Sequence, residues 1–459
     1  MSYTAPPVPC IIDTDPGVDD VIALLLALSS RHLLVLGITV THGNTTLSAA
    51  ADNLKKLFFA LERQLEQLPE LLEQWKGVDP QWRKQYGAGP IEVFLGSEGP
   101  IEGEAVTAKY FHGVDGLANC ATRHPDLTTP PSHISPFFTL STSSALSGVT
   151  SLISRRPSPT VAYVALGPLT SLAQLHLSNP SLLPLFSVIL SMGGAVAHPG
   201  NTTPVAEYNV YADPAAANVI FQLALPNFYL FPLDLTSYLT LPFALYESAV
   251  DPSFATTKSP SQPAGKPPLT HFTSSFLEGT REIMASFGGE AMELHDPTVV
   301  YALIEWARAG AKVGERDGTE RGTFAPGWTW QQVAFEVETH GRLTRGMLVR
   351  DLRHSSQSTT SLTARTGLTN RTQAIEAAEA LDVEEVEAHR AEGERSGEEA
   401  QKRHATRSGA RVVERSPGDE AMRRELLWQV WGVDLEEVMR QELLRQARDM
   451  EAWHKKNWN

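Results

Sequence analysis

The sequence is poor in cysteine and lacks the segments that carry a chain into or across a membrane. Its 459 residues contain two cysteines, Cys10 and Cys120, too few for a disulfide framework, which suits a reducing compartment. No apolar run approaches the roughly 18 residues of a membrane span. The first residues, MSYTAPPVPC, have neither the basic region nor the apolar region of a secretory signal. These absences predict a cytoplasmic protein without a membrane partner.

The chain also has no excess of basic residues. It carries 38 Lys and Arg against 53 Asp and Glu, a formal net charge of −15. A protein that binds phosphate backbones needs a positively charged surface, so nucleic acid is not expected as a partner. The acidity is instead typical of a well-solvated globular protein.

Short β-rich runs alternate with helical stretches through the first half of the chain. The expected strands are residues 8–12, 33–41, 160–166, 187–192 and 228–232, and the expected helices include residues 21–28 and 47–61. This alternation predicts an α/β fold with a mainly parallel central sheet flanked by helices. Ligands of such sheets bind beyond the carboxyl ends of the strands, so the polar residues that follow each strand are the candidates for a site.

Four carboxylates follow the first expected strand within eight residues. The segment DTDPGVDD contains Asp13, Asp15, Asp19 and Asp20 around a turn at Pro16 and Gly17. Such a cluster is self-repelling unless a cation or a proton is shared, and all-oxygen ligands favour calcium or magnesium. A solvated helix cap and turn is the plainer alternative. The aspartyl-phosphate phosphatase motif also begins Asp-x-Asp, but Gly17 stands where that motif needs Thr or Val.

A series of motifs resembles the inosine-uridine-preferring nucleoside hydrolase family in both sequence and order. They are DTDPGVDD, THGNTT, HGVDG, VALGPLTS, SMGG, GNTTPVAEYNVYADP and LHDP, with a weaker match at GRLTRGM. The resemblance implies a Rossmann-like nucleoside hydrolase fold, here with inserted loops and a helical C-terminus. It also implies a small-molecule partner, a nucleoside whose N-glycosidic bond is hydrolysed to ribose and free base, and an enzyme that forms a dimer or tetramer.

Within this resemblance the chain is expected to divide into four parts. Residues 1–353 would form the catalytic domain, and residues 409–432 would return to it as its final strand and helix. Between them, residues 354–408 are first rich in Ser and Thr and then in Glu, Arg and Ala. This stretch has too few large apolar side chains to fold alone and is predicted to be a disordered insertion. Residues 433–459 are expected to form a C-terminal helix.

The resemblance implies a calcium site and a catalytic base. Asp15, Asp20 and Asp296 would supply carboxylate oxygens to the ion, and Leu166 would supply its backbone carbonyl. The metal would lower the pKa of a water molecule, and Asp15 would take its proton.

Further residues are assigned to the substrate by the same resemblance. The expected substrate-binding residues are Asp13, Asp19, Asn44, Met192, Asn201, Glu207 and Asn209. Taken alone, Glu207 and Asn209 could simply mark one side of an exposed extended segment. His295 is expected to protonate the leaving base, and His112 to lie on a loop over the base.

Two other functions stay open. The enzyme could hydrolyse another ribosyl compound such as nicotinamide riboside, or the chain could be an inactive metal-binding descendant with an interaction role. The base preference is not readable from the motifs. Trp75 and Trp82 lie in a segment without a family match, where packing is favoured over stacking on a base.

Overall fold

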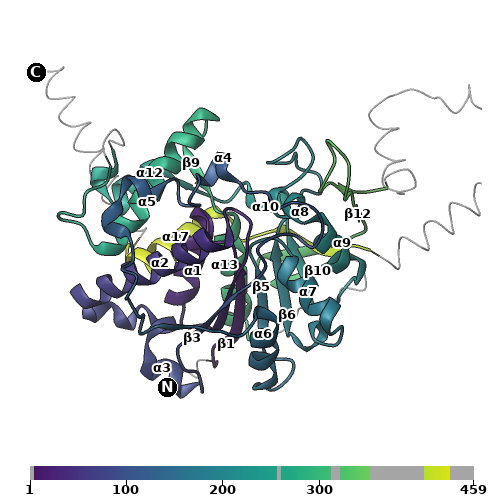
Figure 1. Ribbon diagram of the computed structural model, residues 1–459, viewed down its shortest axis with the longest axis horizontal. Helices are drawn as coiled ribbons and strands as arrows, with labels where there is room; N and C mark the ends of the chain where they lie inside the picture. Colours follow the sequence, from purple (N-terminus) through teal and green to yellow (C-terminus); the bar gives the residue numbers. More distant parts are fainter. Residues whose placement is uncertain (1–4, 256–259, 312–320, 352–407, 435–459) are drawn as a thin grey trace, which may run out of the picture.

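The computed structural model describes residues 5–255, 260–311, 321–351 and 408–434, which form a ten-stranded sheet with helices on both faces (Figure 1). The predicted insertion, apart from its last residue, and nearly all of the predicted C-terminal helix lie outside these residues. Among the helices described, none is long and apolar enough to cross a membrane.

The sheet runs in the order β10-β11-β14-β7-β6-β5-β1-β2-β3-β4. Its strands are β1 (Val8–Thr14), β2 (Leu33–Val40), β3 (Ile91–Leu95), β4 (Phe138–Leu140), β5 (Ala162–Ala165), β6 (Val188–Met192), β7 (Phe228–Phe231), β10 (Arg321–Ala325), β11 (Trp328–Val333) and β14 (Ala410–Arg415). The strands from β14 to β4 pair in parallel, whereas β10 and β11 extend one edge in antiparallel pairs. The predicted α/β class with a mainly parallel sheet is confirmed.

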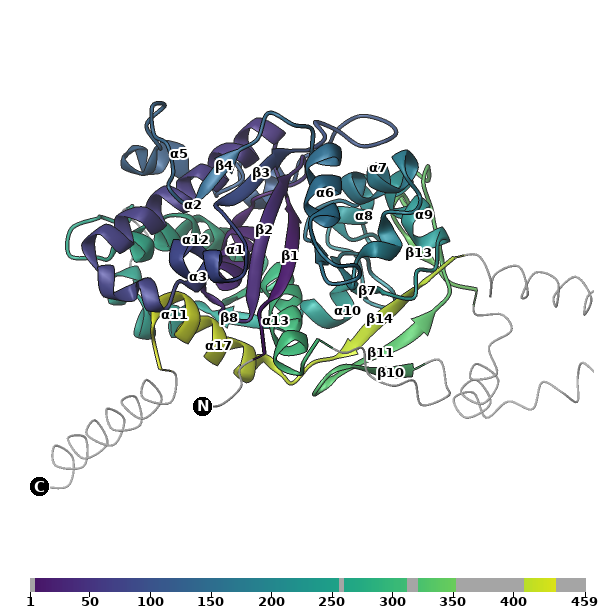
Figure 2. The ribbon, with the colours of Figure 1, turned by 90° about the horizontal axis from the view of Figure 1, so that it is seen from below.

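The two faces of the sheet pack into two hydrophobic cores. Alternation along β1 sends Cys10 and Ile12 into one core and Ile11 into the other. The first core is covered by α1 (Val18–Ser29), α2 (Leu47–Gln67), α12 (Pro268–Ser286), α13 (His295–Arg308) and α17 (Asp419–Trp431). The second is covered by α6 (Ala145–Ser154), α7 (Thr170–Ser178) and α9 (Pro214–Gln222). Figure 2 shows β1 and β2 between these two layers.

Short elements connect this framework. They are η1 (Pro69–Glu73), η2 (Lys76–Val78), α3 (Pro80–Gln85), α4 (Lys109–His112), α5 (Cys120–Arg123), η3 (Pro125–Leu127), η4 (Leu183–Leu185), α8 (Tyr208–Ala212), α10 (Leu233–Thr236), β8 (Thr240–Pro242), α11 (Phe243–Ala249), η5 (Pro252–Ala255), β9 (Ala291–Glu293), β12 (Glu336–Val337) and β13 (Leu348–Val349). The predicted strands of the first half lie within two residues of the observed ones. Trp75 is buried in the first core and Trp82 packs edge-on against Tyr86, so both tryptophans pack as favoured.

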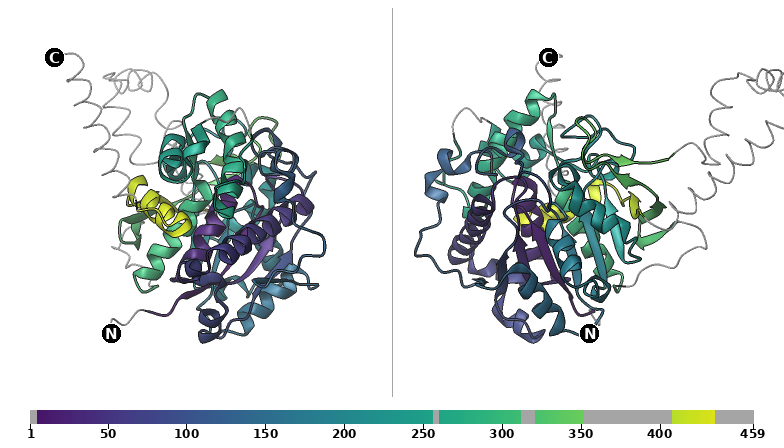
Figure 3. Two further views of the ribbon diagram at one scale, coloured as in Figure 1. Left: turned by 90° about the vertical axis from the view of Figure 1, so that its left-hand side faces the viewer. Right: turned by 45° about the vertical axis from the view of Figure 1, so that its right-hand side comes forward.

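The strand β14 and the helix α17 come from the end of the described chain. β14 lies between β7 and β11, and Arg411 donates to the Tyr229 hydroxyl at 2.9 Å while its guanidinium lies over the Tyr229 and Trp330 rings. The helix α17 (yellow in Figure 3) packs against α1. Both elements are therefore built into the same sheet and the same core as the first strands of the chain.

Candidate active site

The acidic segment lies at the carboxyl end of β1, at the point where the strand order reverses. β1 pairs with β2 on one side and with β5 on the other. Connections that leave a parallel sheet in opposite directions open a crevice at such a point. All twelve residues of α1, which follows the acidic turn, are buried, so the turn is fixed between a central strand and a core helix.

Asp20 organises the turn between β1 and α1. Its Oδ1 accepts hydrogen bonds from the Thr14 hydroxyl at 2.6 Å and the Asp15 amide at 3.2 Å. Its Oδ2 accepts from the Gly17 amide at 3.0 Å and from Asn44 Nδ2 at 2.8 Å. An acidic residue in the first turn of a helix is also favoured by the helix dipole. Asp20 is thus held by four donors before any ligand is considered.

One carboxylate oxygen of Asp15 accepts a hydrogen bond and the other has no partner among the described residues. Its Oδ2 accepts from the Asn44 amide at 2.6 Å, whereas its buried Oδ1 has no hydrogen-bond partner among the described residues. Two glycines allow the backbone to approach this carboxylate. A Cβ at Gly43 would lie 2.0 Å from Asp15 Oδ2, and one at Gly167 would lie 2.5 Å from Oδ1. The site is therefore shaped around the Asp15 side chain.

A compact group of buried carboxylates meets the requirements of a divalent cation. One oxygen from each of Asp19, Asp20 and Asp296 lies within 4.8 Å of the other two. Burial, with Asp20 adding repulsion, raises the pKa of Asp19 to about 7, and burial with the charges of Asp19 and Asp20 raises that of Asp296 well above its usual range. Groups with these properties need protons or a cation to compensate their charge. The residues present fit a hard metal ion.

The expected ligand set differs from this group in one member. Asp15, rather than Asp19, was expected beside Asp20 and Asp296, and burial followed by repulsion from Asp20 raises the pKa of Asp15 too. The Leu166 carbonyl, just past β5, accepts from Asn209 Nδ2 at 2.6 Å. Asp15, Asp20, Asp296 and Leu166 are thus gathered at one edge of the sheet, with Asp19 among them.

Glu207 caps a helix and does not belong to a strand edge. Its Oε1 accepts from the Asn209 amide at 2.7 Å, and its Oε2 accepts from the amides of Val210 at 3.1 Å and Gly194 at 2.7 Å. The segment that could have been an extended edge is therefore the start of α8. Asn209 Nδ2 also lies 3.3 Å from the Met192 carbonyl, so these residues meet at the ends of β5 and β6.

Three other expected substrate residues have different surroundings. Asn44 bonds both Asp15 and Asp20, as described above. Burial raises the pKa of Asp13 to about 8, opposed by the nearby hydroxyls of Ser171 and Tyr163, so its neighbours lie toward the second core. Asn201 is exposed on the loop before α8, where its Oδ1 accepts from the Thr202 hydroxyl at 3.3 Å.

His295 is held between two polar side chains that the sequence did not reveal. Its Nδ1 lies 2.8 Å from the Thr236 hydroxyl, and its Nε2 lies 2.9 Å from Glu293 Oε2. Burial alone would lower the pKa of His295, but the hydrogen bond and charge of Glu293 outweigh it and the pKa is raised. Glu293 lies two residues before His295 in ELHDP, which was the available signal. Thr236 is 59 residues away in the sequence, and no local pattern connected it with His295.

His112 is packed against the start of α1. Its Nδ1 accepts from the Val18 amide at 3.3 Å, and burial lowers its pKa to about 4. The ring is therefore neutral near pH 7. The following loop is tied down as well, because Asn53 Nδ2 donates to the carbonyls of Pro16 and Asp115. His112 thus lines the acidic turn itself.

Comparison with known proteins decides the family. The sequence signature described as inosine-uridine preferring nucleoside hydrolase matches residues 10–70 and 81–388. The chain belongs to this family. Membership confirms the expected enzyme class, an N-ribosyl hydrolase, and agrees with the acidic metal-binding group at the end of β1.

Curated relatives of this nucleoside hydrolase include bacterial and yeast proteins. A pyrimidine-specific ribonucleoside hydrolase RihA of Salmonella paratyphi B is 31% identical over 346 residues, covering 75% of this chain and 88% of that one. The uncharacterized protein C17G8.02 of Schizosaccharomyces pombe is 33% identical over 229 residues, covering 49% of this chain and 57% of that one.

Solved structures confirm the fold of this nucleoside hydrolase. The plant nucleoside hydrolase PpNRh1 superposes with a TM-score of 0.59 at 20% identity, covering 93% of this chain and 99% of that one. A purine-preferring ribonucleoside hydrolase from Gardnerella vaginalis gives a TM-score of 0.58 at 16% identity, covering 92% and 98%. The expected Rossmann-like nucleoside hydrolase fold is therefore present.

Proposed function

We propose that this enzyme hydrolyses the N-glycosidic bond of ribonucleosides, giving ribose and a free base, with calcium as its metal. The single observation that carries the proposal is the buried group of Asp19, Asp20 and Asp296 at the carboxyl end of β1. The burial of all three carboxyl groups, and the raised pKa values of Asp19 and Asp296, make this a place where positive charge is stabilised, whether of an ion or of a ribosyl cation. The family supplies the class of reaction.

Calcium is proposed because every candidate ligand is a hard oxygen. Asp15, Asp20 and Asp296 would bind through carboxylates and Leu166 through its carbonyl, a donor set that calcium accepts in flexible geometries. When bound, the ion would supply Lewis-acid chemistry that makes a water molecule easier to deprotonate. The same charge would relieve the repulsion that raises the pKa of Asp15 and Asp296 in the metal-free site.

Asp15 is proposed as the general base. Its Oδ1 is the buried oxygen without a hydrogen-bond partner among the described residues, so it can accept a proton, while Oδ2 is fixed by the Asn44 amide. This division keeps the carboxylate oriented during proton transfer. Asp13 and Asn44 are proposed to support the pocket, since Asn44 joins Asp15 to Asp20.

The ribose is proposed to lie against the ends of β5 and β6. Asp19 and Asn209 would hold its secondary hydroxyls, Glu207 and Asn201 its 5′-hydroxyl, and Met192 would lie alongside the ring. Glycosidic cleavage passes through an oxocarbenium-like transition state, and nearby carboxylates stabilise that positive charge electrostatically.

His295 is proposed to protonate the leaving base. The contacts with Thr236 and Glu293 orient the ring and favour its charged form, which is the form a general acid needs. Pyrimidine bases depart as poorer leaving groups and depend on such help, and a relative that matches 75% of this chain is named pyrimidine-specific. We therefore propose that pyrimidine nucleosides are among the substrates, with His112 near the base.

Ribose release from inosine, uridine, adenosine, guanosine, cytidine and nicotinamide riboside tests the proposal. Each compound is assayed with and without a calcium chelator, and activity is restored with calcium or magnesium. Ribose from at least one nucleoside, lost on chelation and recovered best with calcium, is the expected result. Ribose released from nicotinamide riboside alone would show that the substrate is another ribosyl compound and not a purine or pyrimidine nucleoside. No ribose from any compound, with calcium still bound, would favour the inactive descendant.

A further inference from the structure

A second group of potential metal ligands lies away from the acidic turn. His124 is positioned between α5 and η3, Asp126 lies in η3, and His271 lies in the first turn of α12. One donor atom from each lies within 4.8 Å of the other two. Both imidazoles are 2% exposed, whereas Asp126 is 44% exposed. The group is therefore buried at its imidazole end and open to solvent at its carboxylate end.

One buried imidazole nitrogen in this group is unsatisfied. His124 Nε2 makes no hydrogen bond with any described residue. Glu278 Oε2 lies 3.4 Å from this nitrogen, at ion-pair distance, and already accepts a hydrogen bond from Arg123 at 3.0 Å. A buried polar atom without a partner costs about 1–3 kcal/mol, so its presence in a well-packed region calls for a ligand.

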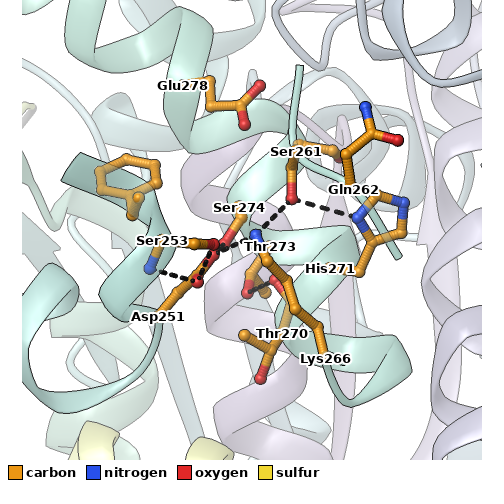
Figure 4. Close-up of polar contacts among 12 residues, drawn as sticks. Asp251, Ser253, Ser261, Gln262, Lys266, Thr270, His271, Thr273, Ser274 and Glu278 are labelled. Carbon is orange, nitrogen blue, oxygen red and sulfur yellow. Dashed lines mark hydrogen bonds and ion pairs between the residues drawn. The ribbon is translucent and has the colours of Figure 1, made fainter. Parts of the chain in front are cut away.

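The other imidazole is oriented by a chain of polar contacts. His271 Nε2 lies 2.9 Å from Asp126 Oδ2, and its Nδ1 lies 3.1 Å from the Ser261 hydroxyl. Ser261 in turn accepts from Lys266 Nζ at 2.8 Å, as Figure 4 shows. Metal-binding histidines usually have their second nitrogen fixed in this way, which sets the ring orientation.

The nearby cations are neutralised by carboxylates outside the group. Lys266 Nζ lies 2.7 Å from Asp251 Oδ2, and Arg123 lies 3.0 Å from Glu278 Oε2. The two nearby cations are therefore paired elsewhere, and the group itself offers two imidazoles and one carboxylate.

We infer that His124, Asp126 and His271 form a second metal site, which takes a divalent transition metal of the zinc type. Two imidazole nitrogens, which are borderline ligands, together with one carboxylate oxygen form a donor set that zinc accepts, in contrast to the all-oxygen group at the end of β1. Glu278 or water would complete the coordination. The exposed Asp126 provides the path by which the ion enters.

Such an ion would join two parts of the structure that border the active site. His124 and Asp126 follow the loop that carries His112 and Asp115, whereas His271 belongs to α12, which leads through β9 to His295. A metal between them would fasten that loop to α12. The site is therefore structural, and its loss should lower thermal stability in the presence of zinc without removing the catalytic group.

Equilibrium dialysis of the full-length protein against zinc tests this inference. Metals are first removed with a chelator, and calcium is then kept in excess so that the acidic group is filled. One zinc ion per chain is expected to bind, with a rise in the melting temperature. Asp126→Asn, at an exposed side chain, is expected to fold normally and to lower zinc affinity at least about tenfold. His271→Asn is expected to lower zinc affinity by a similar factor.

Two matched variants distinguish this site from the others. His133→Asn removes an imidazole that pairs with Glu62 at 2.7 Å outside the group, and it should leave zinc binding unchanged. Asp20→Asn should impair catalysis and retain the zinc. Cobalt bound in place of zinc should give the intense visible absorption of a four-coordinate, zinc-like site. No zinc bound by the wild-type protein under these conditions, or equal affinity in Asp126→Asn, would overturn the inference.

Discussion

Calcium binding to this nucleoside hydrolase should be strongly dependent on pH, because the proposed ligands Asp15 and Asp296 and their neighbour Asp19 hold protons in the metal-free protein. Burial and mutual repulsion raise the pKa of Asp19 to about 7 and those of Asp15 and Asp296 well above their usual range. A bound calcium ion requires ionised carboxylates, so binding must release these protons.

The magnitude follows from Asp19 alone. A group with a pKa of about 7 is roughly 90% protonated at pH 6 and roughly 10% at pH 8. Because Asp19 lies beside the ligands Asp20 and Asp296, its ionisation should raise calcium affinity by up to about tenfold over that range. The pKa values of Asp15 and Asp296 are raised as well, so these two residues add to the pH dependence of calcium affinity. A tenfold gain in affinity corresponds to about 1.4 kcal/mol of additional stabilisation by saturating calcium.

The stability of the metal-free protein should change in the opposite direction. A buried carboxyl group with a raised pKa stabilises the folded state through its proton. That contribution is complete below an unfolded pKa of about 4 and is lost as the pH rises through the folded value, about 7 for Asp19. The increase in the free energy of unfolding on adding calcium should therefore be largest at pH 8 and smallest at pH 6.

Calorimetric titration of chelator-treated protein with calcium measures both quantities. Titrations at pH 6, 7 and 8, each in two buffers of different ionisation enthalpy, give the affinity and the number of protons released. Asp19→Asn should flatten the pH dependence, whereas Asp52→Asn, at an exposed acid on α2, should leave it unchanged. Equal affinity at pH 6 and pH 8 with no proton release would refute the electrostatic account of this site.

Four substitutions test individual assignments. Asp15→Ala should lower turnover by at least about a thousandfold, because base and ligand are lost together, and near-normal ribose release would contradict the mechanism. His295→Ala should reduce inosine hydrolysis more than hydrolysis of p-nitrophenyl riboside, whose leaving group needs no proton; equal losses would make His295 structural. Glu293→Gln removes the charge that raises the pKa of His295, so the alkaline limb of the pH profile of kcat/KM should move to lower pH. An unchanged profile would contradict the role of Glu293 in setting this pKa. Gly43→Ala would place a Cβ 2.0 Å from Asp15 Oδ2 and should lower turnover at least about tenfold. Circular dichroism checks that the variant is folded, and full activity would show that the backbone can move to make room for the methyl group.

The centre of the parallel sheet was predictable because its strands are short apolar runs with polar residues at their carboxyl ends, whereas the parallel strands β3 and β4 were not among those expected. The edge strands β10 and β11 were not predicted, since Arg321–Ala325 and Trp328–Val333 mix polar and aromatic residues in a segment that is polar and Gly-rich at its start. Their strand character comes from the pairing of β10 with β11 and of β11 with β14, which no local pattern shows.

The site was predictable where one segment carries several of its residues. The turn from Asp13 to Asp20 and the segment from Asn201 to Asn209 are of this kind, and their motifs carried the family resemblance. Contacts between distant segments gave no such signal. Thr236 reaches His295 only through the packing of α10 against α13, and His271 meets Asp126 across 145 residues of sequence. Glu207 was not expected as a helix cap because Glu is a less common cap than Ser, Thr, Asp or Asn.

The position of β14 in the sheet has a consequence for how the protein forms. Arg411 pairs with Tyr229, so the strand beside β7 is synthesised about 180 residues after β7 itself. Until it emerges from the ribosome, β7 is an open sheet edge and the β10–β11 hairpin has nothing to pair with. Such a late, long-range pairing slows folding and leaves an edge that can capture another chain. Completion of the catalytic sheet therefore waits until the segment 410–415 has been synthesised.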